Sequence, residues 1–260
     1  MEYPLDRIEY DKLDRVEDRM WWFAAAHANL IGSYKALSAR GQTADLADAP
    51  VLDAGCGTGG LLAKIGAEFP RRLVIGVDAD KFAAARAGQK AGRPVCVGSV
   101  NALPFANATF AAIFSADVLC HRNVNEASAL QQFHRCLRHD GLLILNLPAY
   151  RWMLSRHDIA VANVRRYDLR SMTAPLRAAG FRLIYATYWN AILFPAMAIG
   201  RKLLPAWRAQ ASDVEVQSPA LETIGRLATT VERMVLRRGL RLPFGGSLLA
   251  VAVKDEIPHA

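Results

Sequence analysis

The sequence predicts an α/β protein built on a doubly wound, mostly parallel sheet. From residue 50 to 148, short apolar runs alternate with helix-forming segments, which is the pattern of strand–helix–strand units. The apolar runs contain few polar residues, as expected for strands that are covered on both faces. With 260 residues, 52% of them apolar, the chain is long enough to bury the core of one large domain that carries a cap.

The first half of the chain predicts a helical region followed by alternating elements. Residues 6–39 contain many helix formers and no proline, and the first glycine there is Gly32, so we expect helices. From Pro50 onward, each strand is a short apolar run and each helix is a longer segment. We expect strands at 51–53, 73–77, 94–97 and 110–114, and helices at 59–69, 80–91 and 126–137.

The second half predicts three more strands, three more helices and an irregular region. Residues 149–168 are rich in arginine and aromatic residues, so we expect a loop or short helices there. Gly180 ends the helix before the sixth strand, and the polar composition of residues 210–218 is typical of a mobile segment. We expect strands at 141–147, 181–188 and 247–253, and helices at 169–179, 191–207 and 221–238, the last one amphipathic.

These elements predict three parts along the chain. They are an N-terminal helical cap (1–48), a ligand-binding core (49–148), and a final part (149–260) that supplies lid helices and the strands completing the sheet. The cap contains Trp21, Trp22 and Phe23, which cannot all face one side of a helix. We expect all three to fill the core, or one of them to reach a ligand.

The composition favours acidic partners. The net charge of +8 and the pI near 9.6 fit phosphates, nucleic acid or an anionic membrane surface, or only a solvated basic face. The basic residues are spread rather than gathered in one dense patch, so we expect no nucleic-acid binding.

The cysteines lack metal-ligand spacing, which predicts reduced structural thiols, no metal site and a cytoplasmic protein. They are Cys56, Cys96, Cys120 and Cys136.

The apolar stretch at 183–200 is the segment closest to a membrane span. It is interrupted by Asn190 and Pro195 and is shorter than a spanning helix requires, so we expect none. The polar, acidic first residues predict no signal peptide. Residues 191–204 are apolar and end with basic residues, so they could lie peripherally on a membrane, admit a lipid-like substrate, or form a buried cap helix or a homodimer face.

The most specific signal is the glycine-rich turn after the first strand, at residues 53–60. Glycines permit positive φ and close approach of a ligand, and the following helix offers free N–H groups. Asp53, before the first glycine, suits a cationic amino acid and would repel a pyrophosphate. Asp78 ends the next strand, where a carboxylate can accept two hydrogen bonds from a ribose diol.

This segment resembles motif I of the class I S-adenosylmethionine (SAM)-dependent methyltransferases. Gly76–Asp78 resembles motif II, and residues 101–110 resemble the "LPF…sFD" segment of small-molecule methyltransferases related to the ubiquinone and menaquinone enzymes. Residues 137–143 are similar to their turn into strand five. The tryptophans near the N-terminus, Ser155–Asp158 and Gly245–Leu249 are similar to a bacterial subgroup of mostly unassigned substrate.

The resemblance implies a seven-stranded, Rossmann-like sheet with an antiparallel last strand and a helical cap. It also implies SAM as the cofactor, with S-adenosyl-L-homocysteine as its product. The implied cofactor-binding residues are Asp53, Gly55, Cys56, Gly57, Gly59, Asp78, Ala79, Ser99, Val100 and Ala116. Three departures weaken single contacts: Ser99 replaces an adenine-binding aspartate, Ala111 replaces an acid, and His139–Asp140 replace the usual proline. The subgroup's arginines are replaced by Ala26 and His27.

The acceptor side is expected after strands four and five and in the cap. Methyl transfer mainly requires alignment of the nucleophile and exclusion of water, with a general base only where the acceptor must lose a proton. The candidate catalytic residues are His121, His157 and Tyr167. Arg165 and Arg166 could bind an anion, or pair with Asp158 or Asp168. Tyr150, Trp152 and Trp189 could line an apolar acceptor pocket or pack in the core.

The leading hypothesis is methyl transfer from SAM to a small, hydrophobic molecule such as a lipid, quinone, isoprenoid or natural-product intermediate. A second hypothesis is a SAM-binding protein of the same fold with another activity, cyclase-like or interaction-mediating. A nucleotide-dependent oxidoreductase is disfavoured, because Asp53 would face and repel a pyrophosphate. The acceptor atom and the oligomeric state are not specified by the sequence.

Overall fold

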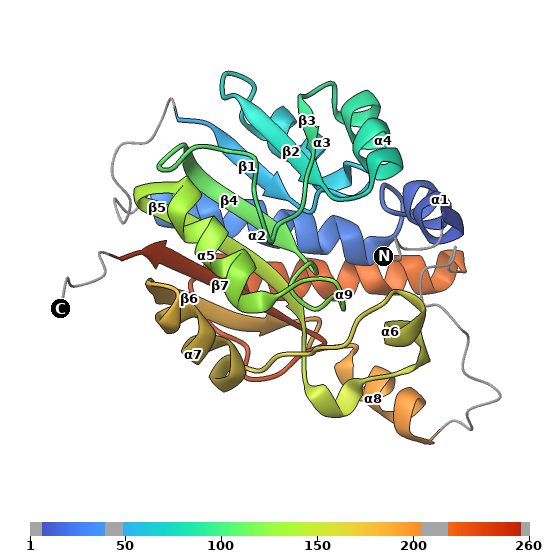
Figure 1. Cartoon of the computed structure of the whole chain (residues 1–260). Helices are drawn as coiled ribbons and strands as arrows, with labels where there is room; N and C mark the ends of the chain where they lie inside the picture. The colour runs from blue at the N-terminus through green and yellow to red at the C-terminus, as the bar shows by residue number, and fades with distance from the viewer. Residues whose placement is uncertain (1–6, 40–48, 204–217, 256–260) are drawn as a thin grey trace.

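The computed structural model of the chain describes residues 7–39, 49–203 and 218–255. Seven strands form one sheet in the order β3-β2-β1-β4-β5-β7-β6 (Figure 1). The strands are β1 (Val51–Ala54), β2 (Val74–Asp78), β3 (Val95–Val97), β4 (Phe110–Ala116), β5 (Leu137–Pro148), β6 (Phe181–Trp189) and β7 (Ser247–Lys254). Each expected strand therefore has a counterpart in the sheet.

All strands of the sheet run in one direction except β7. β1 pairs in parallel with β2 and β4, β2 with β3, and β4 with β5. β7 lies antiparallel between β5 and β6, so β6 keeps the direction of β5. The predicted doubly wound sheet with an antiparallel last strand is confirmed. The carboxyl ends of the parallel strands meet at one edge, which is where open α/β sheets bind ligands.

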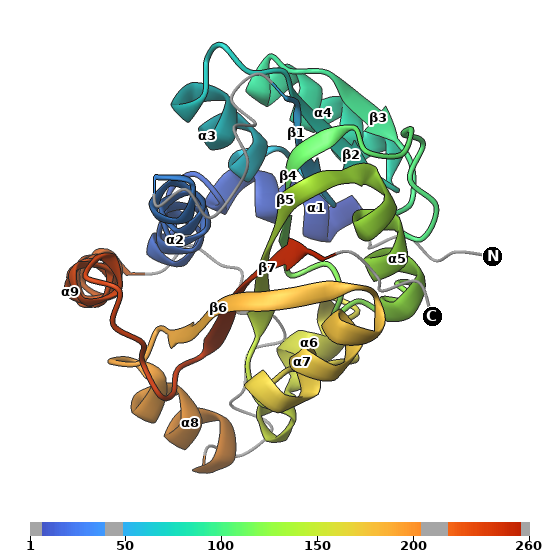
Figure 2. The ribbon, with the colours of Figure 1, turned by 90° about the vertical axis from the view of Figure 1, so that its left-hand side faces the viewer.

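Helices cover both faces of the sheet (Figure 2). One face buries apolar side chains of α2 (Trp21–Ser38) and α3 (Gly60–Glu68), and α9 (Pro219–Arg237) packs against α2. The other face buries those of α5 (Glu126–Cys136) and α7 (Leu169–Ala178). The remaining helices are α1 (Arg7–Val16), α4 (Lys81–Ala91), the single-turn η1 (Arg151–Met153), α6 (Arg156–Ala160) and α8 (Phe194–Leu203).

The close approach of α9 to α2 depends on one glycine. A Cβ at Gly225 would overlap the indole ring of Trp21, which is itself buried. On the same side of α9, the Glu232 carboxylate accepts hydrogen bonds from the backbone N–H groups of Asn190, at 2.6 Å, and Ile192, at 2.8 Å. The C-terminal helix is thus fixed both to the N-terminal cap and to the chain that leaves β6.

The structure differs from the predicted elements at three places. The helical region at 6–39 is two helices, separated where Met20 adopts an extended backbone. The fifth strand begins at Leu137, which pairs with Phe110 across a register shift. The helix expected at 191–207 begins at Phe194, and its end lies outside the described residues, as does most of the 210–218 segment. Among the residues that the structure describes, no helix is long and apolar enough to span a membrane.

Candidate cofactor and acceptor site

The glycine-rich turn after β1 is packed too tightly for any other residue type at two of its positions. Gly55 and Gly59 have φ values of 78° and 96°, a backbone region that favours glycine. A Cβ at Gly55 would overlap the side chain of Val118, and one at Gly59 would lie 2.6 Å from the Cα atom of Ala87. The turn therefore packs closely between α4 and the segment that follows β4. Its backbone lies at the carboxyl edge of the sheet.

Asp53 lies in β1, just before the turn, and is buried. Its side chain is 1% exposed, and one carboxylate oxygen, Oδ2, has no hydrogen-bond partner among the described residues. Burial raises the pKa of Asp53 well above its ordinary value, and the nearby carboxylates of Asp78 and Glu17 raise it further. A buried acceptor without a donor is costly, so this position is suited to receive a cation or an N–H group.

Asp78 ends β2 and faces the same turn. Its carboxylate accepts hydrogen bonds from the backbone N–H of Gly57, at 2.8 Å, and of Asp80, at 3.0 Å. Burial raises the pKa of Asp78, while these two bonds lower it. Asp80 in turn caps α4, because its carboxylate accepts from the N–H groups of Phe82 and Ala83. The structure thus brings the two predicted carboxylates together at neighbouring strand ends.

The first helix lies over the turn as a cover. The ring of Tyr10 in α1 is close enough to Asp78 that this charge, together with burial, raises the pKa of its hydroxyl. The Glu17 carboxylate, just after α1, accepts hydrogen bonds from the Thr58 hydroxyl, at 2.6 Å, and from the Gly60 N–H, at 3.2 Å, and pairs with Lys90. The cap predicted for the N-terminal region therefore includes a carboxylate at the N-terminus of α3. The sequence analysis missed Glu17, because no local pattern links it to a turn some forty residues away.

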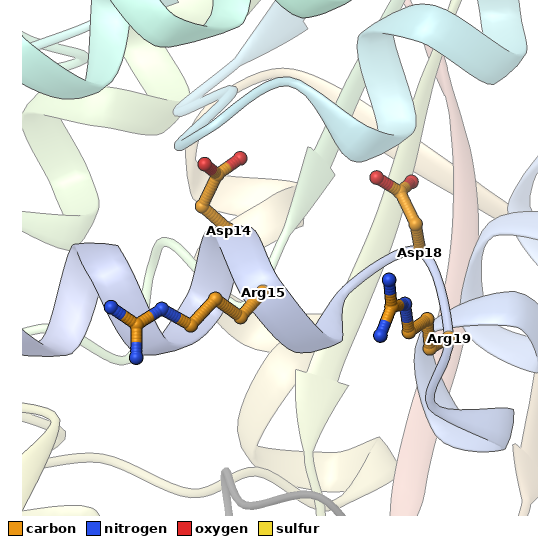
Figure 3. A pocket seen from close by; sticks show the side chains of 4 residues that line it. All are labelled: Asp14, Arg15, Asp18 and Arg19. Carbon is orange, nitrogen blue, oxygen red and sulfur yellow. The ribbon is translucent and has the colours of Figure 1, made fainter.

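A hollow along α1 is a separate feature from this site. It is lined by Asp14, Arg15, Asp18 and Arg19 (Figure 3). The two acids point toward α4, where Asp14 pairs with Arg86 and Lys90, both at 2.7 Å. Arg15 points away from these two acids. Since no side chain from the strand ends lines the hollow, we assign it to the attachment of α1 rather than to the acceptor.

The other predicted cofactor residues lie at the same edge of the sheet. Cys56 is buried within the turn, and burial raises the pKa of its thiol. Ala79 is exposed directly after β2, and Val100 is buried after β3. The Ser99 hydroxyl accepts a hydrogen bond from the N–H of Asn101 at 3.2 Å, and Ala116 is half-buried at the end of β4. Their contacts with a cofactor stay predictions.

The three predicted catalytic residues occupy different settings. His121 is largely buried, and burial lowers the pKa of its ring. The Tyr167 hydroxyl donates to the carbonyl oxygen of Leu119 at 2.9 Å, and its side chain is only 3% exposed. His157 lies in α6, but its side chain falls outside the described residues. The catalytic roles of all three residues stay predictions. The hydrogen bond from Tyr167 to Leu119 indicates that Tyr167 holds the segment after β4 in position.

The arginines of the lid are held by the protein itself. Arg166 donates from two guanidinium nitrogens to the Asp158 carboxylate, at 2.9 and 3.0 Å, and both side chains are buried. This bidentate pair lowers the pKa of Asp158. Arg165 donates to the carbonyl oxygens of His121 and Val124. The sequence left open whether these arginines bind an anion or pair with a neighbouring acid. For Arg166, the described contacts show pairing with Asp158.

Asp117 is a further buried carboxylate at this edge, which the sequence analysis missed. It follows β4 with a φ of 54°, and burial raises its pKa from the ordinary 3.8 to about 7. Asn146 on β5 donates to its Oδ2 atom at 3.0 Å, whereas Oδ1 has no partner among the described residues. The sequence signal that could have identified Asp117 is an acid at the end of a strand, as for Asp53 and Asp78.

The orientation of Asn146 is fixed by a second contact. The indole N–H of Trp189, which can only donate, donates to Asn146 Oδ1 at 2.8 Å. The Asn146 amide must therefore present its NH₂ group to Asp117. Trp189 is fully buried, so it belongs to the core and to this polar chain rather than to an open pocket wall.

Aromatic rings gather next to these strand ends. Tyr150 stacks on Tyr188, with centroids 5.1 Å apart, and on Trp152, at 5.9 Å. Phe194 contacts Tyr150 and Trp152, and Phe244 extends the group beyond Phe194. Trp152 and Phe244 remain 48% and 45% exposed. This aromatic cluster offers an apolar surface of the kind that binds flat or branched hydrocarbon groups.

The described residues contain no group of three or more His, Cys, Asp or Glu side chains arranged to hold a metal ion.

Comparison with known proteins finds a match to a methyltransferase family model over part of the chain and a similar fold in solved structures. Residues 51–141 match a family model described as a methyltransferase domain. A sequence search of curated proteins finds no match. Among solved structures, a chain from a Haloferax volcanii complex that contains the Trm112 methyltransferase activator is similar with a TM-score of 0.59 and 17% identity, over 95% of this chain and 98% of that one.

Two further structures bear on the chemistry of the fold. Geranyl diphosphate C-methyltransferase from Streptomyces coelicolor A3(2), crystallised with S-adenosyl-L-homocysteine, has a TM-score of 0.54 and 14% identity, over 85% of this chain and 76% of its own. The [4+2]-cyclase SpnF has a TM-score of 0.55 and 18% identity, over 88% and 82%. At such identities the likeness establishes a shared fold.

Proposed function

We propose that this chain, whose residues 51–141 match a methyltransferase-domain model, is a class I methyltransferase that transfers a methyl group from SAM to a small, hydrophobic acceptor. The observation that carries the proposal is the pair of carboxylates, buried Asp53 and half-buried Asp78, at the ends of neighbouring parallel strands. Bound SAM supplies a methyl group already activated on a sulfonium.

The charge of the site fits a cationic cofactor. Asp53, Asp78 and Glu17 place three carboxylates near one another, and each has its pKa raised by burial. An ammonium and a sulfonium would relieve that repulsion, whereas a pyrophosphate would increase it. The unpartnered Oδ2 of Asp53 would hold the ammonium of the methionine moiety, and Asp78 the ribose hydroxyls.

Asp117 is the residue best suited to handle the acceptor. It lies between the cofactor strands and β5, and its pKa of about 7 is that of an efficient general base near neutral pH. Its free Oδ1 would accept a hydrogen bond from an acceptor hydroxyl or amine, and would take its proton where methylation requires it. Asn146, oriented by Trp189, would keep the carboxylate in place.

The aromatic cluster supports a hydrophobic acceptor. Tyr150, Tyr188, Trp152, Phe194 and Phe244 adjoin the ends of β5 and β6, on the side of Asp117 away from the predicted cofactor residues. Apolar surface in contact with hydrocarbon excludes water from the methyl-transfer line, which alignment chemistry needs. A prenyl, quinone or polyketide-like acceptor matches this surface.

Titration calorimetry with SAM tests the proposal. We expect Asp78→Ala to weaken SAM binding by at least about tenfold, the scale of a lost charge-assisted hydrogen bond. Asp255→Ala is the matched control, since Asp255 lies after β7 and pairs with the exposed Arg182. Wild-type protein that binds neither SAM nor S-adenosyl-L-homocysteine would contradict the proposal, as would an Asp78→Ala variant with unchanged affinity.

A second candidate function is a SAM-binding enzyme that transfers no methyl group. It is favoured by the likeness of fold to a cyclase and by the absence of the family's usual acid at Ala111. Incubation with SAM and a panel of prenyl and quinone acceptors separates the two. Release of S-adenosyl-L-homocysteine with a product heavier by one methylene supports methyl transfer, while conversion of an acceptor without SAM consumption supports the second function.

A further inference from the structure

α9 carries an apolar stripe that the fold does not use. Four of its side chains, spaced three or four residues apart, are between 52% and 64% exposed: Ile224, Leu227, Val231 and Met234. Over this span a helix rises about 15 Å. Leu240, in the chain that follows, is also 57% exposed.

The stripe is distinct from the face by which α9 is attached. Gly225, Ala228, Thr229 and Glu232 are the buried positions of the helix, and they serve the contacts with Trp21 and with the chain after β6. At 100° per residue, Ile224, Leu227, Val231 and Met234 lie within an arc of about 80° beside this buried face, whereas Leu221 lies on the line of the buried face itself. Viewed along the helix, α9 lies on the outside of α2, at the margin of the molecule (Figure 2).

The charges next to the stripe are mainly positive. Arg237, Arg238 and Arg241 are exposed and Arg233 is partly exposed, and Arg237 contributes to lowering the pKa of Arg233 by like-charge proximity. Of the two acids of the helix, Glu232 is buried and Glu222 pairs with Arg226 at 2.7 Å. An apolar stripe on a helix whose C-terminal end carries exposed arginines is complementary to the acyl and headgroup regions of an anionic bilayer.

We propose that α9 binds peripherally to a membrane surface rich in anionic phospholipid. The stripe from Ile224 to Met234 enters the acyl boundary, and the arginines at the C-terminal end of the helix contact lipid phosphates. The sequence suggested residues 191–204 for such a role, and Ile192 and Ile199 there are also exposed, at 52% and 58%, but the longer apolar stripe lies on α9. The surface is separate from the methyl-transfer site, so its test needs neither SAM nor an acceptor.

Vesicle co-sedimentation of the full chain tests the proposal. We expect binding to vesicles of phosphatidylglycerol and phosphatidylcholine in equal parts, and much weaker binding to pure phosphatidylcholine. The double variant Leu227→Gln/Val231→Gln should bind at least about tenfold more weakly, since glutamine keeps the helix but removes apolar burial. Arg233→Gln/Arg237→Gln should lose at least about tenfold in binding to the anionic vesicles, at roughly fivefold per arginine.

The control is Leu73→Gln/Val97→Gln, which removes two aliphatic side chains of similar exposure, 49% and 59%, from the β2–β3 side of the sheet. It should bind vesicles as the wild type does, and circular dichroism checks that each variant is folded. Absence of binding to anionic vesicles by folded wild type overturns the proposal, as does binding that the α9 variants leave unchanged. Ultracentrifugation showing a dimer that Leu227→Gln/Val231→Gln dissociates, without vesicle binding, would assign the stripe to a second copy instead.

Discussion

Replacing Asp117 by asparagine should make the protein more stable at alkaline pH and less active. In the folded chain the pKa of this carboxyl is about 7, against an ordinary value of 3.8. A folded-state pKa that is raised means that stability is lost as pH rises from the unfolded pKa to the folded one. The asparagine variant lacks this ionisation, and asparagine tolerates the positive φ of 54° at this position.

The magnitude follows from the two pKa values. At about 1.4 kcal/mol per pH unit, the raised pKa of Asp117 lowers the stability of the wild type by roughly 4 kcal/mol at pH 8 and about 2 kcal/mol at pH 5. Below pH 4 both proteins carry a neutral group that Asn146 can bond, so they should differ by less than about 1 kcal/mol. The stability advantage of Asp117→Asn should therefore grow by about 2–3 kcal/mol between pH 5 and pH 8.

Urea denaturation followed by tryptophan fluorescence measures this difference at each pH. Asp255→Asn, a change at an exposed ion pair, is the control and should alter stability by less than about 0.5 kcal/mol at either pH. An advantage of Asp117→Asn that stays constant from pH 5 to pH 8 would refute the argument that a buried, half-satisfied carboxylate is held there. In the methyl-transfer assay the same variant should lose at least about a hundredfold in turnover if a proton must be removed.

Three other substitutions probe the site and its support. Asp53→Asn should raise the melting temperature of the free protein at neutral pH, because the carboxylate it replaces is buried beside two others, and should abolish the further rise on addition of SAM in a thermal-shift assay. Trp189→Phe should destabilise by about 2–4 kcal/mol in urea, since it opens a cavity and leaves Asn146 Oδ1 without its donor. Gly225→Ala should lower the free energy of unfolding by about 1–3 kcal/mol, because the new methyl group overlaps Trp21. Gly32→Ala has nothing within 4 Å of its new methyl group, so it should stabilise α2 by about 0.5–1 kcal/mol. Equal effects of the two glycine changes would contradict the packing described for α9.

The sheet could be predicted from sequence because its signals are local. Each strand from Val51 to Val97 is a short apolar run that ends at a turn residue or an acid, and such runs are interpretable without knowledge of their partners. The start of β5 was missed because Leu137–Asp140 contains arginine, histidine and aspartate. Those residues belong to the strand because Leu137 pairs with Phe110 of β4 across a register shift. That pairing depends on β4 and leaves no signal in the sequence of residues 137–140.

The site was predictable only where a carboxylate adjoins the glycine-rich turn or ends the next strand. Asp53 and Asp78 satisfy that rule. Glu17 does not, because α1 brings it to the turn through tertiary packing alone. The arginines of the lid show the opposite limit: sequence identifies Arg166 as able to bind an anion, but only the structure shows that Asp158 already occupies its guanidinium.

The acids of the carboxyl edge link the stability of this fold to its proposed function. Asp53, Asp78, Glu17 and Asp117 all have their pKa values raised by burial, so each one ionised at neutral pH destabilises the free protein. A cation bound among the first three removes part of that cost, and ligand binding of this kind stabilises the fold in proportion to its affinity. The same burial therefore lowers the stability of the protein when its carboxylates are ionised. It also favours a positively charged cofactor over a pyrophosphate. Asp117, one strand further, would keep its raised pKa only while the acceptor side stays dry, which is the condition that the aromatic cluster provides.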